Sequence, residues 1–188
     1  MRKGVYPGSF NPPTTAHLAI SYAARRTHRL DVVVWSVSTI ALAKEAVTRP
    51  LLEDRIKVLD EVASGLDWLE IVTTEAQLLV DIAAGFDVLI MGADKWHQIQ
   101  DIIFYDNDPG KRDAAMRALP AVAVAPRPPL EVPPASALDV PAWAGEISST
   151  AARNGNESMM LDEAAAFDRR TGAWSDPARY EEWIKSRE

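Results

Sequence analysis

A hydroxyl and an imidazole stand three residues apart near the N-terminus, in a segment that also carries a glycine and two consecutive prolines. The segment covers residues 6–18 and has the sequence YPGSFNPPTTAHL. Gly8 lets the backbone approach a ligand closely, and Asn11-Pro12-Pro13 favours a rigid turn. Thr14 and His17 lie at a predicted helix start, where their spacing places both side chains on one face. Both then point at the ligand of the helix N-terminus, for which phosphate is the natural candidate.

A second group of hydroxyls lies at residues 147–153, with the sequence ISSTAAR. Ser148, Ser149 and Thr150 follow a proline-rich stretch and predict a helix N-terminus, which offers hydroxyls and unpaired N–H groups to phosphate oxygens. Arg153 follows one turn later and can pair with the same phosphate. Taken alone, the segment is also compatible with an ordinary helix cap and a solvent-facing arginine. The same simpler interpretation, a cap followed by a surface histidine, applies to the first segment.

Further candidates lie at the ends of predicted strands. Gly92-Ala93-Asp94 directly follows the apolar run 87–91. Gly92 can present its backbone to a ligand and the Asp94 carboxylate can accept hydrogen bonds, although the same three residues also make a good turn and cap. Trp96 and Trp35 are candidates for stacking on a pyridine or adenine ring, and the alternative for both is a place in the core.

The composition narrows the classes of protein to consider. The chain has 188 residues, 47% of them hydrophobic, which is enough for one domain with a real core. A formal net charge of −7 argues against nucleic acid as a partner but permits a small anion. Cysteine is absent, which excludes disulfides and thiolate chemistry. No apolar run reaches the length of a membrane helix, so we expect a soluble, cytoplasmic protein with no membrane partner. A homo-oligomer is compatible with the sequence.

Strand and helix patterns alternate along the chain and must position these residues. Short β-branched or apolar runs predict strands at 4–6, 31–37, 69–72, 87–91 and 121–125. Helical periodicity predicts helices at 16–26, 50–64 and 77–84. The alternation predicts a doubly wound α/β fold, a parallel five-stranded sheet with helices on both faces. The candidate residues then follow the carboxyl ends of strands, where such folds bind ligands.

The remaining stretches are a connection and a tail. Residues 126–141 contain six prolines and predict a surface connection that is neither helix nor central strand. The tail is charged and helix-prone, with Phe167, Trp174, Tyr180 and Trp183 as possible anchors. We therefore expect a single domain over 1–188, with a core at about 3–153 and a helical extension at 154–188.

Three segments together resemble the nucleotidyltransferase superfamily, which is cytidylyltransferase-like and Rossmann-like. Its signature G-[ST]-F-[DN]-P-x-[HT]-x-G-H is similar to residues 8–17, GSFNPPTTAH, where Thr14 replaces the first histidine and Ala16 the usual glycine. Residues 147–153 resemble the ISSTxxR motif of the same superfamily. Gly92-Ala93-Asp94 resembles the GAD that follows the fourth strand in nicotinamide and nicotinate mononucleotide adenylyltransferases, the closest members.

This resemblance implies an adenylyltransferase that moves AMP from ATP to the phosphate of nicotinate or nicotinamide mononucleotide and releases pyrophosphate. Magnesium is expected with ATP, held by substrate oxygens and water, and no metal site of the protein itself is predicted. The implied catalytic residues are His17, Thr14, Arg153 and Lys44. The implied ATP-binding residues are Gly8, Ser9, Phe10, His17, Gly92, Asp94, Ser148, Ser149, Thr150 and Arg153. The implied acceptor-binding residues are Asn11, Lys44 and Trp96, and for Lys44 a solvated lysine beside Glu45 is the alternative.

Two other functions are compatible with the sequence. The acceptor can be phosphopantetheine or another phosphorylated molecule, with adenylyl or cytidylyl transfer, and Thr14 fits that option well. The turn at Gly92-Ala93-Asp94 instead favours a pyridine nucleotide. The chain can also be a weakly catalytic nucleotide-binding protein that keeps the fold, an option that Ala16 and the unfamiliar tail leave open.

Overall fold

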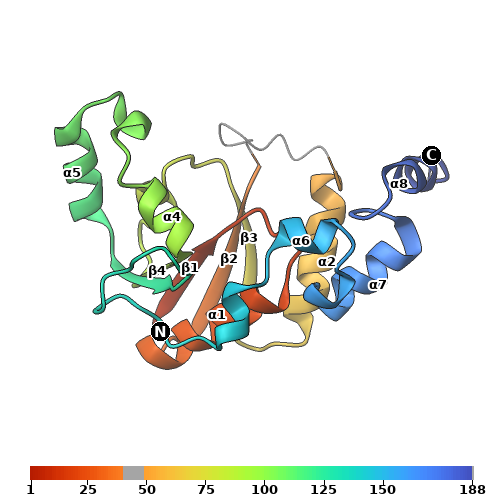
Figure 1. The fold of residues 1–188 in the computed structure, drawn as a ribbon, viewed down its shortest axis with the longest axis horizontal. Helices are drawn as coiled ribbons and strands as arrows, with labels where there is room; N and C mark the ends of the chain where they lie inside the picture. Colours follow the sequence, from red (N-terminus) through yellow and green to blue (C-terminus); the bar gives the residue numbers. More distant parts are fainter. Residues whose placement is uncertain (40–48, 188) are drawn as a thin grey trace.

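The computed structural model describes residues 1–39 and 49–187. Its centre is a five-stranded sheet with parallel pairings in the order β3-β2-β1-β4-β5 (Figure 1). The strands are β1 (Lys3–Pro7), β2 (Val32–Ser38), β3 (Leu69–Thr74), β4 (Val88–Gly92) and β5 (Ala121–Ala125). Each predicted strand is found within a few residues of its expected limits, and the doubly wound α/β class is confirmed.

Helices cover both faces of the sheet. The α-helices are α1 (Thr15–His28), α2 (Leu52–Ser64), α3 (Leu79–Ile82), α4 (Ala93–Gln98), α5 (Pro109–Ala118), α6 (Ser149–Arg153), α7 (Asp162–Thr171) and α8 (Pro177–Lys185). Short 3-10 helices are η1 (Ile102–Tyr105), η2 (Ala142–Gly145) and η3 (Glu157–Met159). Helices α1 and α2 contribute to the hydrophobic cluster on one face, and α3, α4 and α5 pack into the cluster on the other.

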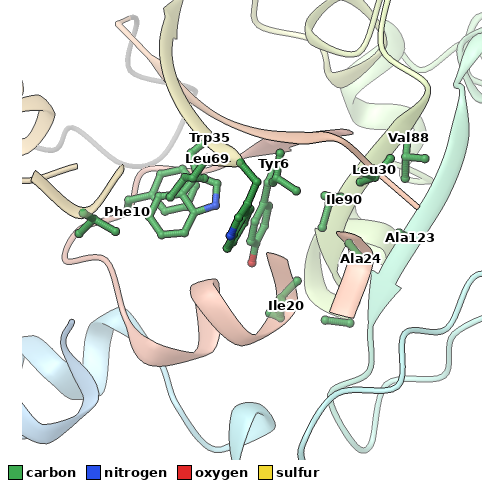
Figure 2. Close-up of a cluster of buried hydrophobic side chains, with 14 of the residues drawn as sticks. Tyr6, Phe10, Ile20, Ala24, Leu30, Trp35, Leu69, Val88, Ile90 and Ala123 are labelled. Atoms are coloured by element: carbon green, nitrogen blue, oxygen red, sulfur yellow. The ribbon is translucent and has the colours of Figure 1, made fainter. Parts of the chain in front are cut away.

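The two clusters follow from the alternation of side chains along the buried strands. Val88 and Ile90 of β4 belong to the first cluster, which Figure 2 shows, whereas Leu89 and Met91 belong to the second. All four side chains are buried, as a strand covered on both faces requires. The nearly continuous apolar run in the sequence is thus the signature of a central strand.

Differences from the predicted helices lie between β3 and β5. The helix expected at 77–84 is a single turn, α3, and both α4 and α5 were not predicted. No side chain of α5 is fully buried, and Met116 packs only partly against the second cluster, so the sequence lacks the apolar periodicity that reveals a helix. It begins instead at a cap, where the Asp108 carboxylate accepts hydrogen bonds from the N–H groups of Gly110 and Lys111.

The C-terminal segment packs against α2. Phe167, Trp174 and Tyr180 are buried and Trp183 partly buried, in a third hydrophobic cluster that includes Val58 of α2. Helices α7 and α8 lie beside α2, at the end of the molecule opposite α5 (Figure 1). The predicted aromatic anchors are therefore confirmed. None of the described helices has the combination of length and apolarity needed to cross a bilayer.

The strand order creates a topological switch point between β1 and β4. From β1 the chain moves outward to β2 and β3, and then returns to the other side of β1 to build β4 and β5. In doubly wound sheets, ligands bind at the carboxyl ends of the strands where this reversal occurs, here β1 and β4. The loop of residues 8–14 follows β1, and Gly92 ends β4.

Candidate active site

The loop after β1, residues 8–14 and called the signature loop below, folds onto buried aromatic side chains. Phe10 has a positive φ of 44°, and its ring stacks on Trp35 with centroids 4.6 Å apart (Figure 2). A Cβ atom at Gly8 would lie 3.0 Å from the Phe10 ring, so packing as well as ligand approach favours glycine. Trp35 is fully buried and donates from Nε1 to Ser21 Oγ at 2.8 Å.

Two expectations change as a result. The hypothesis that Trp35 stacks on a ligand ring is wrong, because the side chain is enclosed by the core. Phe10 is only 1% exposed, so contact between Phe10 and a nucleotide has to come from its backbone.

Backbone carbonyls of the signature loop accept hydrogen bonds from distant parts of the chain. Ser9 O accepts from Arg55 Nη1 (2.9 Å), Asn11 O from Arg153 Nη1, Pro12 O from Ser149 Oγ (2.8 Å) and Pro13 O from Leu161 N (3.1 Å). The donors belong to α2, to α6 and to the residue before α7. The loop conformation therefore depends on three separate elements.

The side chain of His17 is held by the residue that caps its own helix. The backbone N–H of Thr14 donates to His17 Nδ1 at 2.9 Å, and Thr14 Oγ1 lies 2.8 Å from the same nitrogen. Because Nδ1 accepts a backbone hydrogen bond, a neutral His17 carries its hydrogen on Nε2. Thr14 is only 1% exposed, so its hydroxyl orients the imidazole and does not face open solvent.

The surroundings of His17 keep the imidazole neutral. Its ring lies between 5.0 and 6.2 Å from the rings of Phe10, Tyr6 and Trp35, measured between centroids. Burial against these rings lowers the pKa of His17 to about 4, since an apolar environment disfavours the charged form. At neutral pH His17 therefore offers a fixed, uncharged N–H donor.

The second motif lies against the first. Ser148 caps α6, and its hydroxyl oxygen accepts a hydrogen bond from Ala151 N at 3.1 Å. Arg153 donates both to the Asn11 carbonyl and to Thr150 Oγ1, at 3.2 Å for the second. The predicted phosphate-binding residues of α6 thus contact the signature loop, as a shared site requires. Whether they bind phosphate stays a prediction.

The third motif is a helix start rather than an isolated turn. Gly92 is the N-cap of α4, and a Cβ atom added there would meet nothing within 4 Å. Neither packing nor backbone conformation requires a glycine, which leaves space for a ligand beside the strand end. Asp94 is exposed and pairs with Arg127, with Oδ2 and Nη1 2.8 Å apart.

Arg127 was not among the sequence candidates. Burial raises the pKa of the Tyr6 phenol, and the positive charge of Arg127 opposes that rise, so the guanidinium is within electrostatic reach of the Tyr6 side chain of β1. Its position two residues after β5 was the available signal, since it is again the carboxyl end of a strand. Arg55, which donates to Ser9 O, and Trp174, which donates to Asn11 Oδ1, were also missed as site residues, because contacts between such distant residues have no local pattern.

Two further candidates have different outcomes. Trp96 is partly buried and packs against the second cluster. It also lines a cavity of about 430 Å³ together with His97, Gln100 and residues 131–134. Lys44 lies outside the described residues.

A larger cavity, of about 940 Å³, lies at the C-terminal end of α1 and is lined by no residue of the three motifs, so it is not the candidate site.

Two known adenylyltransferases are similar in sequence to this chain. The chain is similar to a probable nicotinate-nucleotide adenylyltransferase of Methylorubrum extorquens, with 30% identity over an alignment 183 residues long, gaps included, in which 81% of this chain and 99% of that protein are covered. It is also similar to a phosphopantetheine adenylyltransferase of Limosilactobacillus reuteri, with 34% identity over 94 residues, 49% of this chain and 51% of that enzyme.

The family profile that matches is the cytidylyltransferase-like one, over residues 5–155. The matched stretch begins in β1 and ends just after α6, so it contains all three motifs. The resemblance seen in the sequence is thereby confirmed. This chain belongs to the cytidylyltransferase-like family of nucleotidyltransferases.

Proposed function

We propose that this protein is an adenylyltransferase that moves the AMP part of ATP onto the phosphate of nicotinate or nicotinamide mononucleotide. One observation carries the proposal. The signature loop and α6 are hydrogen-bonded together beside the switch point of the sheet, where β4 ends in an unobstructed glycine, Gly92. Donors that suit a triphosphate therefore stand next to a strand end that suits a nucleotide.

In the proposed reaction, an oxygen of the acceptor phosphate attacks the α-phosphorus of ATP. A new O–P bond forms while the bond from the α-phosphorus to the bridging oxygen breaks, and pyrophosphate leaves with that electron pair. Such direct transfer depends on positioning and charge stabilisation. Magnesium enters as part of the ATP substrate, bound by phosphate oxygens and water.

His17 is proposed to donate a hydrogen bond from its Nε2–H group to an ATP phosphate oxygen as negative charge develops in the transition state. The low pKa makes the imidazole a neutral donor, and Thr14 fixes its orientation through Nδ1. A preorganised donor of this kind costs no rearrangement at the moment of reaction. We therefore assign Thr14 an orienting role and His17 the direct one.

The pyrophosphate is proposed to bind at α6 through Ser148, Ser149, Thr150 and Arg153. Ser149 already donates its hydroxyl to Pro12 O, so its backbone N–H is the group available for phosphate. Arg153 uses two hydrogen bonds within the protein, and a guanidinium has five N–H groups. Lys44 is proposed to neutralise a further phosphate.

The nucleotide is proposed to lie along the signature loop and the start of α4. Gly8, Ser9 and the backbone of Phe10 would contact ATP, and Gly92 and Asp94 would bind a sugar. Asn11 and Trp96 would face the acceptor. The pyridine nucleotide is favoured because Gly92-Ala93-Asp94 matches the pattern of the pyridine enzymes, and because the relative from Methylorubrum, named for nicotinate nucleotide, aligns over 99% of its length.

Phosphopantetheine is the second candidate acceptor. Thr14, which replaces the first histidine of the signature, fits this acceptor. The relative from Limosilactobacillus is named as a phosphopantetheine adenylyltransferase. That similarity covers only half of each protein, so it supports the shared chemistry more than the acceptor.

Pyrophosphate release measured with ATP and each acceptor in turn tests the proposal. We expect release with nicotinate or nicotinamide mononucleotide and none with phosphopantetheine. His17→Ala serves as the control, because losing the positioned donor should lower turnover about a hundredfold or more. Release with phosphopantetheine but with neither mononucleotide would overturn the acceptor assignment. If no pyrophosphate is released with any of the acceptors, a nucleotide-binding role is favoured.

Thermal unfolding in the presence of an unreactive ATP analogue tests the acceptor pocket separately. A mononucleotide that binds the folded state should raise the melting temperature by mass action. Trp96→Ala should reduce that rise while the effect of the ATP analogue alone is kept. An unchanged rise would remove Trp96 from the acceptor site.

A further inference from the structure

The C-terminal extension reaches the signature loop through a buried hydrogen bond. Trp174 Nε1 donates to Asn11 Oδ1 at 2.7 Å, although 163 positions separate the two residues. Both side chains are buried, with exposures of 3% for Trp174 and 7% for Asn11. A buried polar contact of this kind is costly to lose, because its partners have no water to replace it.

The chemistry of the indole group fixes the orientation of the Asn11 amide. An indole N–H can only donate, so the oxygen of Asn11 must face Trp174 and the NH₂ group must face the other way. The Asn11 backbone is fixed as well, because its carbonyl accepts from Arg153. The direction of the Asn11 NH₂ group, a hydrogen-bond donor, is thereby fixed relative to the signature loop.

Trp174 is itself held in place by the extension. The Asp168 carboxylate accepts hydrogen bonds from the backbone N–H groups of Trp174 (2.7 Å) and Ser175 (3.1 Å). The Trp174 ring packs edge-on against Phe167, with centroids 5.9 Å apart. The indole therefore comes from a rigid support.

A second connection lies two residues further along the loop. Leu161 N donates to Pro13 O at 3.1 Å, and Thr14 forms an isolated antiparallel bridge with Met160. Thr14 is the residue that orients His17. The extension thus borders the loop on both sides of its two prolines.

We propose that Trp174 is a positioning residue of the active site, which acts by fixing the Asn11 amide and through it the signature loop, whose Thr14 orients His17. The C-terminal extension is then part of the catalytic apparatus and not only a cover for α2. This inference rests on the adenylyltransferase function proposed above.

The test compares two tryptophan-to-phenylalanine variants of the full chain. Trp174→Phe removes the donor and keeps an aromatic ring. Trp183→Phe is the matched control, since Trp183 belongs to the same hydrophobic cluster and stacks on Tyr180 instead. Turnover and the KM for ATP are measured per folded molecule, well below the melting temperature of each variant.

We expect Trp174→Phe to lower kcat about ten- to a hundredfold, because small displacements of catalytic groups have effects of that size. Trp183→Phe should keep kcat within about twofold, whatever stability it loses. In the Asn11→Ala background, Trp174→Phe should add less than about twofold, because the shared contact is already gone.

Equal kcat in the two single variants, or independent effects of Trp174→Phe and Asn11→Ala, would overturn the proposal. Failure of the proposed function has a different signature, since the wild-type protein would then release no pyrophosphate with any acceptor. In that case, binding of the unreactive ATP analogue tests whether Trp174 positions the signature loop. Weakening by about tenfold in Trp174→Phe but not in Trp183→Phe supports the positioning role, and equal binding refutes it.

Discussion

Replacing His17 by glutamine removes the titrating imidazole but keeps a side chain that can accept the Thr14 N–H. His17 occupies the third position of α1 and accepts the Thr14 N–H, an arrangement in which glutamine is also found. His17→Gln therefore keeps an acceptor for the helix start and removes the titrating group. Any difference in the pH dependence of stability between the two proteins then comes from this single imidazole.

The expected magnitude follows from the pKa. Burial lowers the pKa of His17 from 6.5 to about 4, and each pKa unit corresponds to about 1.4 kcal/mol, which sets an upper limit of about 3 kcal/mol. His17 as a residue is half-buried, so solvent screening reduces the effect and we expect about 1–2 kcal/mol. Because the folded pKa lies below the unfolded one, the contribution is complete above the unfolded value. It is lost as the pH falls from 6.5 toward 4.

Urea unfolding of both proteins, followed by tryptophan fluorescence, measures this difference. Between about pH 7.5 and about pH 5, the wild-type protein should lose about 1–2 kcal/mol more of its free energy of unfolding than His17→Gln does. The other histidines and all carboxylates are common to both proteins and cancel. Parallel stability curves over this range would refute the depressed pKa and the neutral donor built on it.

Three more changes test other parts of the structure. Arg153→Ala should raise the KM for ATP far more than the KM for the acceptor, and steady-state kinetics with equal effects on both would contradict its triphosphate role. Tyr180→Phe should cost about 1–3 kcal/mol in urea unfolding, because the Tyr180 hydroxyl donates to the buried Asp54 carboxylate at 2.5 Å; an unchanged midpoint would contradict this. Gly172→Ala should destabilise by more than about 1 kcal/mol, since φ is +75° and the new Cβ would lie 2.7 Å from a backbone oxygen. Urea unfolding measures this loss, and Gly65→Ala, whose Cβ would lie 3.8 Å from the Val62 backbone oxygen, is the control that should be tolerated.

The parts of the fold that were predicted have local signatures. Strands β2 and β4 are runs of apolar and β-branched residues because both of their faces are buried, and α2 repeats its apolar residues at helical spacing. Helix α5 was missed because none of its side chains is fully buried and its start is specified by the Asp108 cap. Helix α4 was not predicted, although a turn and cap at Gly92-Ala93-Asp94 was one interpretation of the sequence and Gly92 is the cap of this helix.

For the candidate site, the sequence by itself indicated which segments to consider, because motif residues that share a turn or a helix start are close in space whatever the rest of the chain does. Only the tertiary structure decided which of these side chains are buried and which distant residues contact them. Trp35 is inside the core, Arg153 ties α6 to Asn11, and Trp174 fixes the Asn11 amide from the far end of the chain. Such contacts form only when distant segments pack together, and so does the burial that makes His17 a neutral donor.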